Sequence, residues 1–176
     1  MIVPPPGLKI WLDHPTSITD KLKTYHSNVY LTCLSQDWAT QDPWEQQHIP
    51  ATKIFRREIL MYAAEDACWY ARTMIPETTY LLDQSRFERL KTEPLGQIIW
   101  HASDIQRQNM IQFSLHQISL LYQYIAQIPQ LKISETYLWG RLSTFIIKQQ
   151  LPFYLLEIFL PELQHYYDHT SSDTFS

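Results

Sequence analysis

The sequence predicts an α+β domain in which a single antiparallel sheet is flanked by helices. Two pairs of strand-like segments, each pair joined by a few turn residues, have the pattern of β-hairpins, and hairpins give antiparallel sheets. Helix signals gather between the two hairpins, so the helices are expected to cover a face of the sheet. The 176 residues are enough for one domain with a full core and too few for two ordinary ones.

The expected strands are apolar segments, alternating or continuous, that are bounded by turn residues. They span residues 28–35, 53–63, 67–75, 143–148 and 153–160. Residues 64–66 and 149–152 are expected to close the two hairpins. Residues 36–52 are polar and contain two prolines, Pro43 and Pro50, which predicts a loop.

The expected helices begin at capping signals or at a proline in the favoured first position. They run from Ser17 to about Tyr25, from Thr78 or Thr79 to about Lys91, and from Pro94 onward. A fourth helix is predicted over residues 104–128, because apolar side chains recur there at helical spacing, and Pro129 ends it. The single domain is expected to span residues 1–164, and residues 165–176, rich in Ser, Thr and Asp, to form a frayed tail.

Composition excludes several kinds of site. The net charge is only −4 and no basic run occurs, so no surface for nucleic acid is expected. The three glycines cannot form either common phosphate-binding loop. The sequence contains no metal-ligand spacing of Cys and His and no nucleophile-elbow serine motif. An enzyme with this sequence is therefore expected to use no metal, nucleotide or covalent nucleophile, and no cofactor.

Other features of the sequence are typical of a cytoplasmic protein. Cys33 and Cys68 lie in apolar, strand-like segments, where buried free thiols are expected rather than a disulfide. The N-terminus lacks the basic and apolar regions of a signal peptide. No apolar run approaches the roughly 20 residues of a membrane-spanning helix.

One carboxylate, Glu157, lies in the most apolar stretch of the chain, residues 151–161. If this stretch is a strand, Glu157 shares a face with Leu155 and Phe159, and both faces are apolar enough to be covered. Burying an unpaired carboxylate costs several kcal/mol. A partner or a ligand is therefore expected for Glu157.

A cation, Arg57, is placed in the same way on the first hairpin, where alternation puts it on the face of Ile59 and Met61. Two interpretations follow. Arg57 and Glu157 form a buried salt bridge between strands, or they mark the two ends of a binding pocket.

Two predicted helix starts favour the pocket. Ile18 and Leu95 each fall in the first turn of a helix, where backbone N–H groups lack intrahelical partners and bind anions. Together with Arg57 they would form a site for a carboxylate. The alternative is that both helix starts face water.

Six short motifs, in order along the chain, point to a known family. They are Trp11-Leu12 with Thr16-Ser17-Ile18-Thr19, Arg57-Glu58-Ile59-Leu60, Ala71-Arg72-Thr73-Met74-Ile75-Pro76, Pro94-Leu95-Gly96, Leu138-Trp139-Gly140-Arg141 and Glu157-Ile158-Phe159-Leu160-Pro161. In these motifs the chain resembles the chorismate–pyruvate lyase family. Enzymes of that family release pyruvate from chorismate and give 4-hydroxybenzoate, the first committed step of ubiquinone biosynthesis.

The resemblance implies a fold and a site. The fold is an antiparallel sheet flanked by helices, with a ligand pocket enclosed under lids. Arg57 and the backbone amides of Ile18 and Leu95 would bind the ring carboxylate, and Glu157 would face the ring hydroxyl. Arg57 and Glu157 are the expected catalytic residues, with Glu157 acting as a general base or only orienting the ring.

Further expectations concern the second carboxylate of chorismate and the partners. Arg72 and Arg141 are its candidate ligands, although either arginine can equally be structural. The expected partners are chorismate and 4-hydroxybenzoate alone, and the expected state is a monomer.

Other functions remain open. The segment 104–137 is longer than the family usually has, and it could bind a partner protein. Effector-sensing domains of some bacterial transcription regulators also resemble this fold. A non-catalytic module that binds an aromatic acid is therefore the main alternative.

Overall fold

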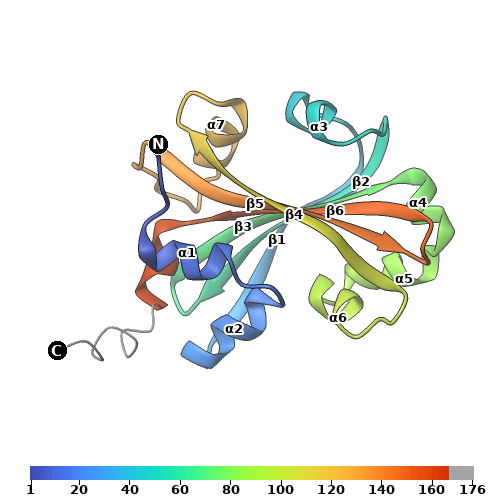
Figure 1. The fold of residues 1–176 in the computed structure, drawn as a ribbon, viewed down its shortest axis with the longest axis horizontal. Helices are drawn as coiled ribbons and strands as arrows, with labels where there is room; N and C mark the ends of the chain where they lie inside the picture. Colours follow the sequence, from blue (N-terminus) through green and yellow to red (C-terminus); the bar gives the residue numbers. More distant parts are fainter. Residues whose placement is uncertain (167–176) are drawn as a thin grey trace.

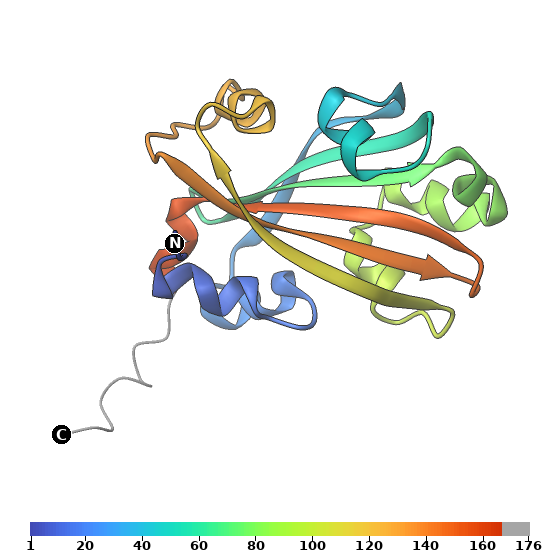
Figure 2. The same cartoon turned by 45° about the horizontal axis from the view of Figure 1, so that its top comes forward.

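One antiparallel sheet of six strands organises the chain (Figures 1 and 2). The structure is a computed structural model and describes residues 1–166. The strand order across the sheet is β1-β2-β3-β6-β5-β4. The strands are β1 Val29–Thr40, β2 Lys53–Ala63, β3 Asp66–Pro76, β4 Ile105–His116, β5 Tyr137–Ile147 and β6 Leu151–Phe159. The predicted α+β class with a single antiparallel sheet is confirmed.

Short helices cover both faces of this sheet (Figure 1). They are α1 Pro6–Leu12, α2 Ile18–Tyr25, α3 Pro43–His48, α4 Glu77–Leu82, α5 Gln84–Glu88, α6 Leu95–Ile99 and α7 Leu120–Ala126, with the 3₁₀ helices η1 Arg89–Lys91 and η2 Pro161–Tyr166. Helices α1, α2 and α6 lie on one face, here called the pocket face, and α3 and α7 lie on the other (Figures 1 and 2). None of the helices within residues 1–166 is long and apolar enough to cross a membrane.

Alternation along β6 places its side chains in separate cores on the two faces, as predicted for this strand. Along β6, Phe153 and Phe159 pack in the pocket-face cores, whereas Leu156 and Ile158 pack in the core of the opposite face. Because both faces of β6 are covered, any polar side chain on this strand is removed from water. Glu157 is therefore buried, as its sequence context indicated.

The helix predicted over residues 104–128 is wrong. Residues Ile105–His116 form β4, and only Leu120–Ala126 are helical. β4 is an edge strand on which half of the residues are exposed, so it lacks the alternating apolar pattern by which strands are recognised. Ile111, assigned to the apolar side of the predicted helix, is 58% exposed. Pairing with β5 along the whole length of β4 overrides the local helical spacing.

The loop predicted over residues 36–52 is also wrong in part. β1 continues to Thr40 beyond an irregularity in its pairing with β2, between Cys33 and Ser35. Helix α3 follows, and Asp42 and Glu45 form its capping box. The signal was present in the sequence as Asp42-Pro43-Trp44-Glu45, since a capping residue followed by proline and a glutamate three positions later starts helices.

Smaller differences concern the ends of elements. β5 begins at Tyr137 rather than Ser143, so Arg141 lies on a strand, and the helix expected to end near Lys91 is divided into α4, α5 and η1. Helix α1 was not predicted. Of the tail expected at 165–176, the first two residues belong to η2, and residues 167–176 lie outside the described part of the chain.

The two cysteines are free thiols in different surroundings. Cys68 is buried as expected, whereas the expected burial of Cys33 is wrong, because it lies exposed on the edge strand β1. Burial raises the pKa of the Cys68 thiol to about 12. We expect a thiol-specific reagent near pH 8 to modify Cys33 alone in the folded protein and both cysteines in denaturant, because the thiolate is the reactive form. Rapid modification of both thiols without denaturant would contradict the burial of Cys68.

Candidate functional site

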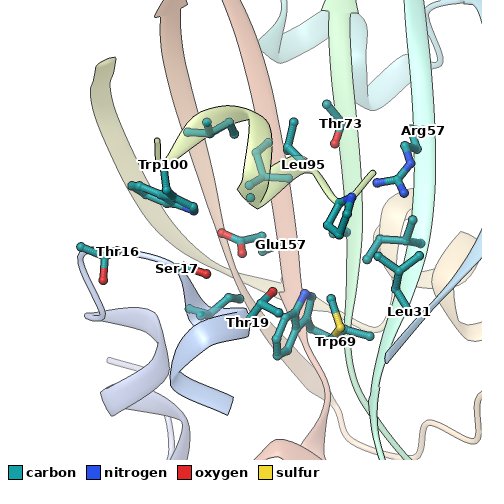
Figure 3. Close-up of a pocket in the computed structure, with 18 of the residues that line it drawn as sticks. Thr16, Ser17, Thr19, Leu31, Arg57, Trp69, Thr73, Leu95, Trp100 and Glu157 are labelled. Atoms are coloured by element: carbon teal, nitrogen blue, oxygen red, sulfur yellow. The ribbon is translucent and has the colours of Figure 1, made fainter. Parts of the chain in front are cut away.

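A cavity of about 70 Å³ lies on the pocket face, between the sheet and the N-terminal ends of α2 and α6 (Figure 3). This volume is several times the ~10–15 Å³ that one water molecule needs. Apolar side chains such as Ile59, Met61 and Leu155 form much of the wall. The polar groups that residues 1–166 contribute to the wall include three arginines and a single carboxylate: Arg57, Arg107, Arg141 and Glu157.

Arg57 extends from β2 toward the cavity (Figure 3). It is only 6% exposed, and its Nε donates a hydrogen bond to Oε1 of Gln36 at 3.1 Å. Among residues 1–166, no carboxylate lies within ion-pair distance of this guanidinium. Burial lowers the pKa of Arg57 from its ordinary value. A buried cation without a counter-ion is a binding group for an anion.

Glu157 extends from β6 into the same cavity (Figure 3). Its Oε1 accepts a hydrogen bond from Nε of Arg141 at 2.7 Å, and the two residues are paired across β5 and β6. The salt bridge considered between Arg57 and Glu157 is therefore wrong, because Arg141 is the partner of Glu157. Its Oε2 has no such bond to the described residues and is available to a ligand.

The fully buried Arg141 connects Glu157 to the N-terminal part of the chain. Its Nη1 is 2.7 Å from the carbonyl oxygen of His14 and also contacts the carbonyls of Trp11 and Leu12, at the end of α1. Arg141 was a candidate for the second carboxylate. It lines the cavity, and its contacts connect the Glu157 carboxylate to the segment before α2.

A glycine beside Arg141 lets β5 and β6 approach closely at this point. A Cβ atom added to Gly140 would lie 2.8 Å from the backbone oxygen of Glu157 and 2.5 Å from Cδ1 of Ile158. Because a backbone atom cannot move aside as a side-chain tip does, any other residue here would displace Glu157. The glycine of the Trp-Gly-Arg motif therefore helps to keep the Glu157 carboxylate in its position.

Arg72, the other candidate for the second carboxylate, does not line the cavity. It pairs with Glu58 across β2 and β3, on the face opposite to the pocket. There its guanidinium bonds to Oδ2 of Asp42 at 2.6 Å and to Oε1 of Glu58 at 3.4 Å, and Glu45 lies 3.7 Å away. Arg57 faces the pocket, so its neighbour Glu58 faces the other side of the sheet. Residues paired across two strands share a face, so Arg72, the partner of Glu58, lies on that other side as well.

The two predicted helix starts both line the cavity. Helix α2 begins at Ile18, and the Ser17 side chain caps it by accepting from the Asp20 amide at 3.1 Å. Helix α6 begins at Leu95 after Pro94, with no side-chain cap. The alternative that both starts face water is wrong, since both residues are buried in the pocket wall. First-turn amides have no intrahelical acceptor, so the amides of Ile18 and Leu95 are candidate hydrogen-bond donors in this wall.

One arginine of the pocket, Arg107, was missed in the sequence. It lies on β4, which was predicted to be a helix, so the alternation of a strand was not used to infer the direction of its side chain. Its guanidinium lies over the ring of Trp100, 5.0 Å from the centroid, and over the ring of Phe145. Reading the segment as a strand, with Ile105 and Arg107 on one face, would have placed it in the pocket.

A sequence model of the chorismate lyase family matches residues 1–170. The chain belongs to the chorismate lyase family. A probable chorismate pyruvate-lyase of Shewanella sp. strain MR-4 is 29% identical over 162 residues, which are 90% of this chain and 81% of that protein. The chorismate pyruvate-lyase of Pectobacterium carotovorum is 26% identical over 166 residues, 93% of this chain and 81% of that protein.

Solved structures resemble this member of the family in fold. A possible transcriptional regulator of Bacillus subtilis aligns with a TM-score of 0.55 at 13% identity, over 84% of this chain and 64% of that one. The ligand-binding domain of a putative GntR-family regulator from Bordetella bronchiseptica aligns with a TM-score of 0.52 at 7% identity, over 76% of this chain and 85% of that one. At such identities the similarity shows a common fold alone.

Proposed function

We propose that the protein is a chorismate–pyruvate lyase, which converts chorismate into 4-hydroxybenzoate and pyruvate without a cofactor. The observation that supports this most is the pair of buried ionic groups in one cavity: Arg57, which has no counter-ion among residues 1–166, and Glu157, which is held by Arg141. The family membership supplies the substrate. The product would enter ubiquinone biosynthesis as its first committed precursor.

The polar groups suggest how the substrate lies. The ring carboxylate binds Arg57, preferably through two hydrogen bonds, with the amides of Ile18 and Leu95 as further donors. The hydroxyl at C4, on the other side of the ring, lies against Glu157. Helices α2 and α6, which begin at those two amides, act as lids over the ring. Residues 1–164 carry the whole site as one domain, and one chain supplies every group.

The reaction is an elimination that makes the ring aromatic. The ether bond at C3 breaks, the ring loses the hydrogen at C4, and the enolpyruvyl methylene gains a hydrogen, which gives pyruvate. Aromatisation makes the step strongly favourable, so the protein mainly positions the substrate and compensates its charge. Glu157 either accepts the C4 hydrogen as a proton or orients the hydroxyl while that hydrogen passes directly to the enolpyruvyl methylene.

The proposal is tested by incubating purified protein with chorismate and following 4-hydroxybenzoate in the ultraviolet and pyruvate by a coupled assay. Both products are expected in equal amounts without added metal or nucleotide. Release from a buried site can limit turnover, so enzyme in excess over chorismate is measured as well as catalytic amounts. Unchanged chorismate in both regimes would contradict the proposal.

Substitution of Glu157 separates its two roles. If Glu157 accepts a proton, Glu157→Gln should lower the single-turnover rate by about 10²- to 10⁴-fold, the usual contribution of a general base. If it only orients the ring, the loss should stay below about tenfold, since an amide still contacts a hydroxyl. Thermal unfolding of the variant controls for the lost ion pair with Arg141.

The second candidate function is a non-catalytic module that binds an aromatic acid. The fold shared with a regulator's ligand-binding domain favours it. In that case 4-hydroxybenzoate binds with the same dependence on Arg57, and chorismate is recovered unchanged from the protein.

A further inference from the structure

Two nitrogen atoms of Arg107 are buried in the pocket wall without a hydrogen-bond partner among residues 1–166. They are Nε and Nη2, whereas Nη1 donates to the carbonyl oxygen of Pro15 at 2.9 Å. Leaving a buried donor unsatisfied is costly, more so when it belongs to a charged group. Buried donors of native proteins are normally paired, so these two call for an acceptor that residues 1–166 do not supply, such as a bound ligand.

The surroundings of Arg107 hold its guanidinium in place without neutralising it. The rings of Trp100 and Phe145 lie against it, with distances to the ring centroids of 5.0 and 5.4 Å. Burial lowers the pKa of Arg107, the neighbouring charge of Arg141 lowers it further, and Glu157 acts in the opposite direction. Glu157 is already bonded to Arg141, so Arg107 has no ion-pair partner in the described part of the chain.

Strand order places Arg107 on the opposite side of Glu157 from Arg57. Across the sheet, β6 with Glu157 is two strands from β2 with Arg57 and two strands from β4 with Arg107. Figure 3 agrees, since Glu157 appears between Arg57 and Trp100, the ring on which Arg107 lies. The pocket therefore presents cation, carboxylate and cation in that order. This arrangement fits a ligand with two anionic groups and a polar group between them.

We propose that Arg107 binds a second carboxylate of the ligand, the one carried on the side chain next to the ring hydroxyl. This rests on the proposed function: in chorismate that group is the enolpyruvyl carboxylate. Nε and Nη2 of one guanidinium lie side by side, which suits the two oxygens of a carboxylate. Arg72 faces the other side of the sheet, and Nε and Nη1 of Arg141 are engaged by Glu157 and the carbonyl of His14. Arg107 is thus the arginine of this wall with two buried nitrogen atoms left unpaired among residues 1–166.

A pair of unreactive ligands tests the proposal by calorimetry. The first is 3-(carboxymethoxy)-4-hydroxybenzoate, which has the second carboxylate. The second is 3-(carbamoylmethoxy)-4-hydroxybenzoate, in which a neutral amide of the same shape replaces that carboxylate. The wild-type protein should bind the carboxylate compound at least ~10-fold more tightly, and Arg107→Gln should reduce this ratio to less than ~3-fold. A control, Arg89→Gln, removes an exposed arginine that pairs with Glu93 and should leave the ratio unchanged.

The ratio of the affinities for the two compounds distinguishes a binding role of Arg107 from structural damage. If Arg107 only supports the wall through Trp100 and Pro15, its substitution weakens both compounds equally, and the proposal is overturned. Equal affinities in the wild-type protein overturn it as well, even if Arg107→Gln does not fold. If the wild-type protein prefers the carboxylate compound but converts no chorismate, the proposed function fails and the second anion site stands.

Discussion

Replacing Arg57 with alanine is expected to lower kcat/KM for chorismate by at least ~10²-fold. The guanidinium has no counter-ion in the described structure, so its interactions with a bound carboxylate are charge-assisted and desolvated. Affinity for 4-hydroxybenzoate should fall with it, because the ring carboxylate is common to substrate and product. Steady-state kinetics and calorimetry measure the two losses.

The same variant distinguishes a binding residue from a structural one. Removing Arg57 deletes no ion pair, and its one side-chain bond within the described chain is to Gln36, so the melting temperature should change little. Arg89→Ala removes an exposed arginine that does not line the cavity, so it serves as the matched control and should retain full activity. Full activity of Arg57→Ala together with a lower melting temperature would show that Arg57 supports the sheet.

Replacing Arg72 with alanine is expected to lower the free energy of unfolding by about 3–5 kcal/mol, the usual effect of removing one partner from a buried ion pair. Arg72 is 1% exposed and lies among Asp42, Glu45 and Glu58, which would lose their shared cation. Because the side chain is on the face opposite to the pocket, kcat/KM of the folded variant should stay within a few-fold of wild type. Urea denaturation and kinetics below the transition measure these quantities.

The acid dependence of stability gives an independent measure of this network. Burial raises the pKa of Glu58, but bonds from Tyr70 and Ser35 and the charge of Arg72 outweigh it, so the net pKa is lowered. A lowered pKa in the folded state means that Glu58 contributes stability above its unfolded pKa of about 4.3 and loses it as the pH falls through the folded value. Arg72→Ala should weaken this contribution. If the variant is fully stable and instead loses affinity for chorismate, Arg72 belongs to the site and its assignment to the opposite face is wrong.

Much of the fold, and the placement of two residues of the candidate site, could be predicted from the sequence alone. The hairpin of β2 and β3 and the strand β6 are rich in apolar side chains with clear turns, so their positions were predicted closely. Once those strands were placed, alternation alone directed Arg57 and Glu157 to apolar faces. These two residues were accessible to sequence analysis because a charge in an apolar strand contrasts with its neighbours.

The remaining groups of the pocket depend on tertiary structure. The partner of Glu157 follows from the pairing of β5 with β6, and β5 was predicted to begin after Arg141. Arg107 lies on an edge strand, where exposed polar side chains interrupt the alternation of apolar and polar residues that is typical of a strand. The apolar residues of this segment instead recur at a helical spacing. Edge strands are therefore the elements in which local pattern is least informative and pairing with a neighbour decides the structure.

A crystal structure of the protein with 4-hydroxybenzoate is the most direct test of this site. We expect the product in the cavity on the pocket face, with its carboxylate on Arg57 and the amides of Ile18 and Leu95, and its hydroxyl at the free oxygen of Glu157. Arg107 should then contact water or an anion rather than the product. A product bound in the reverse orientation, or outside this cavity, would contradict the assignment of the two ends of the pocket.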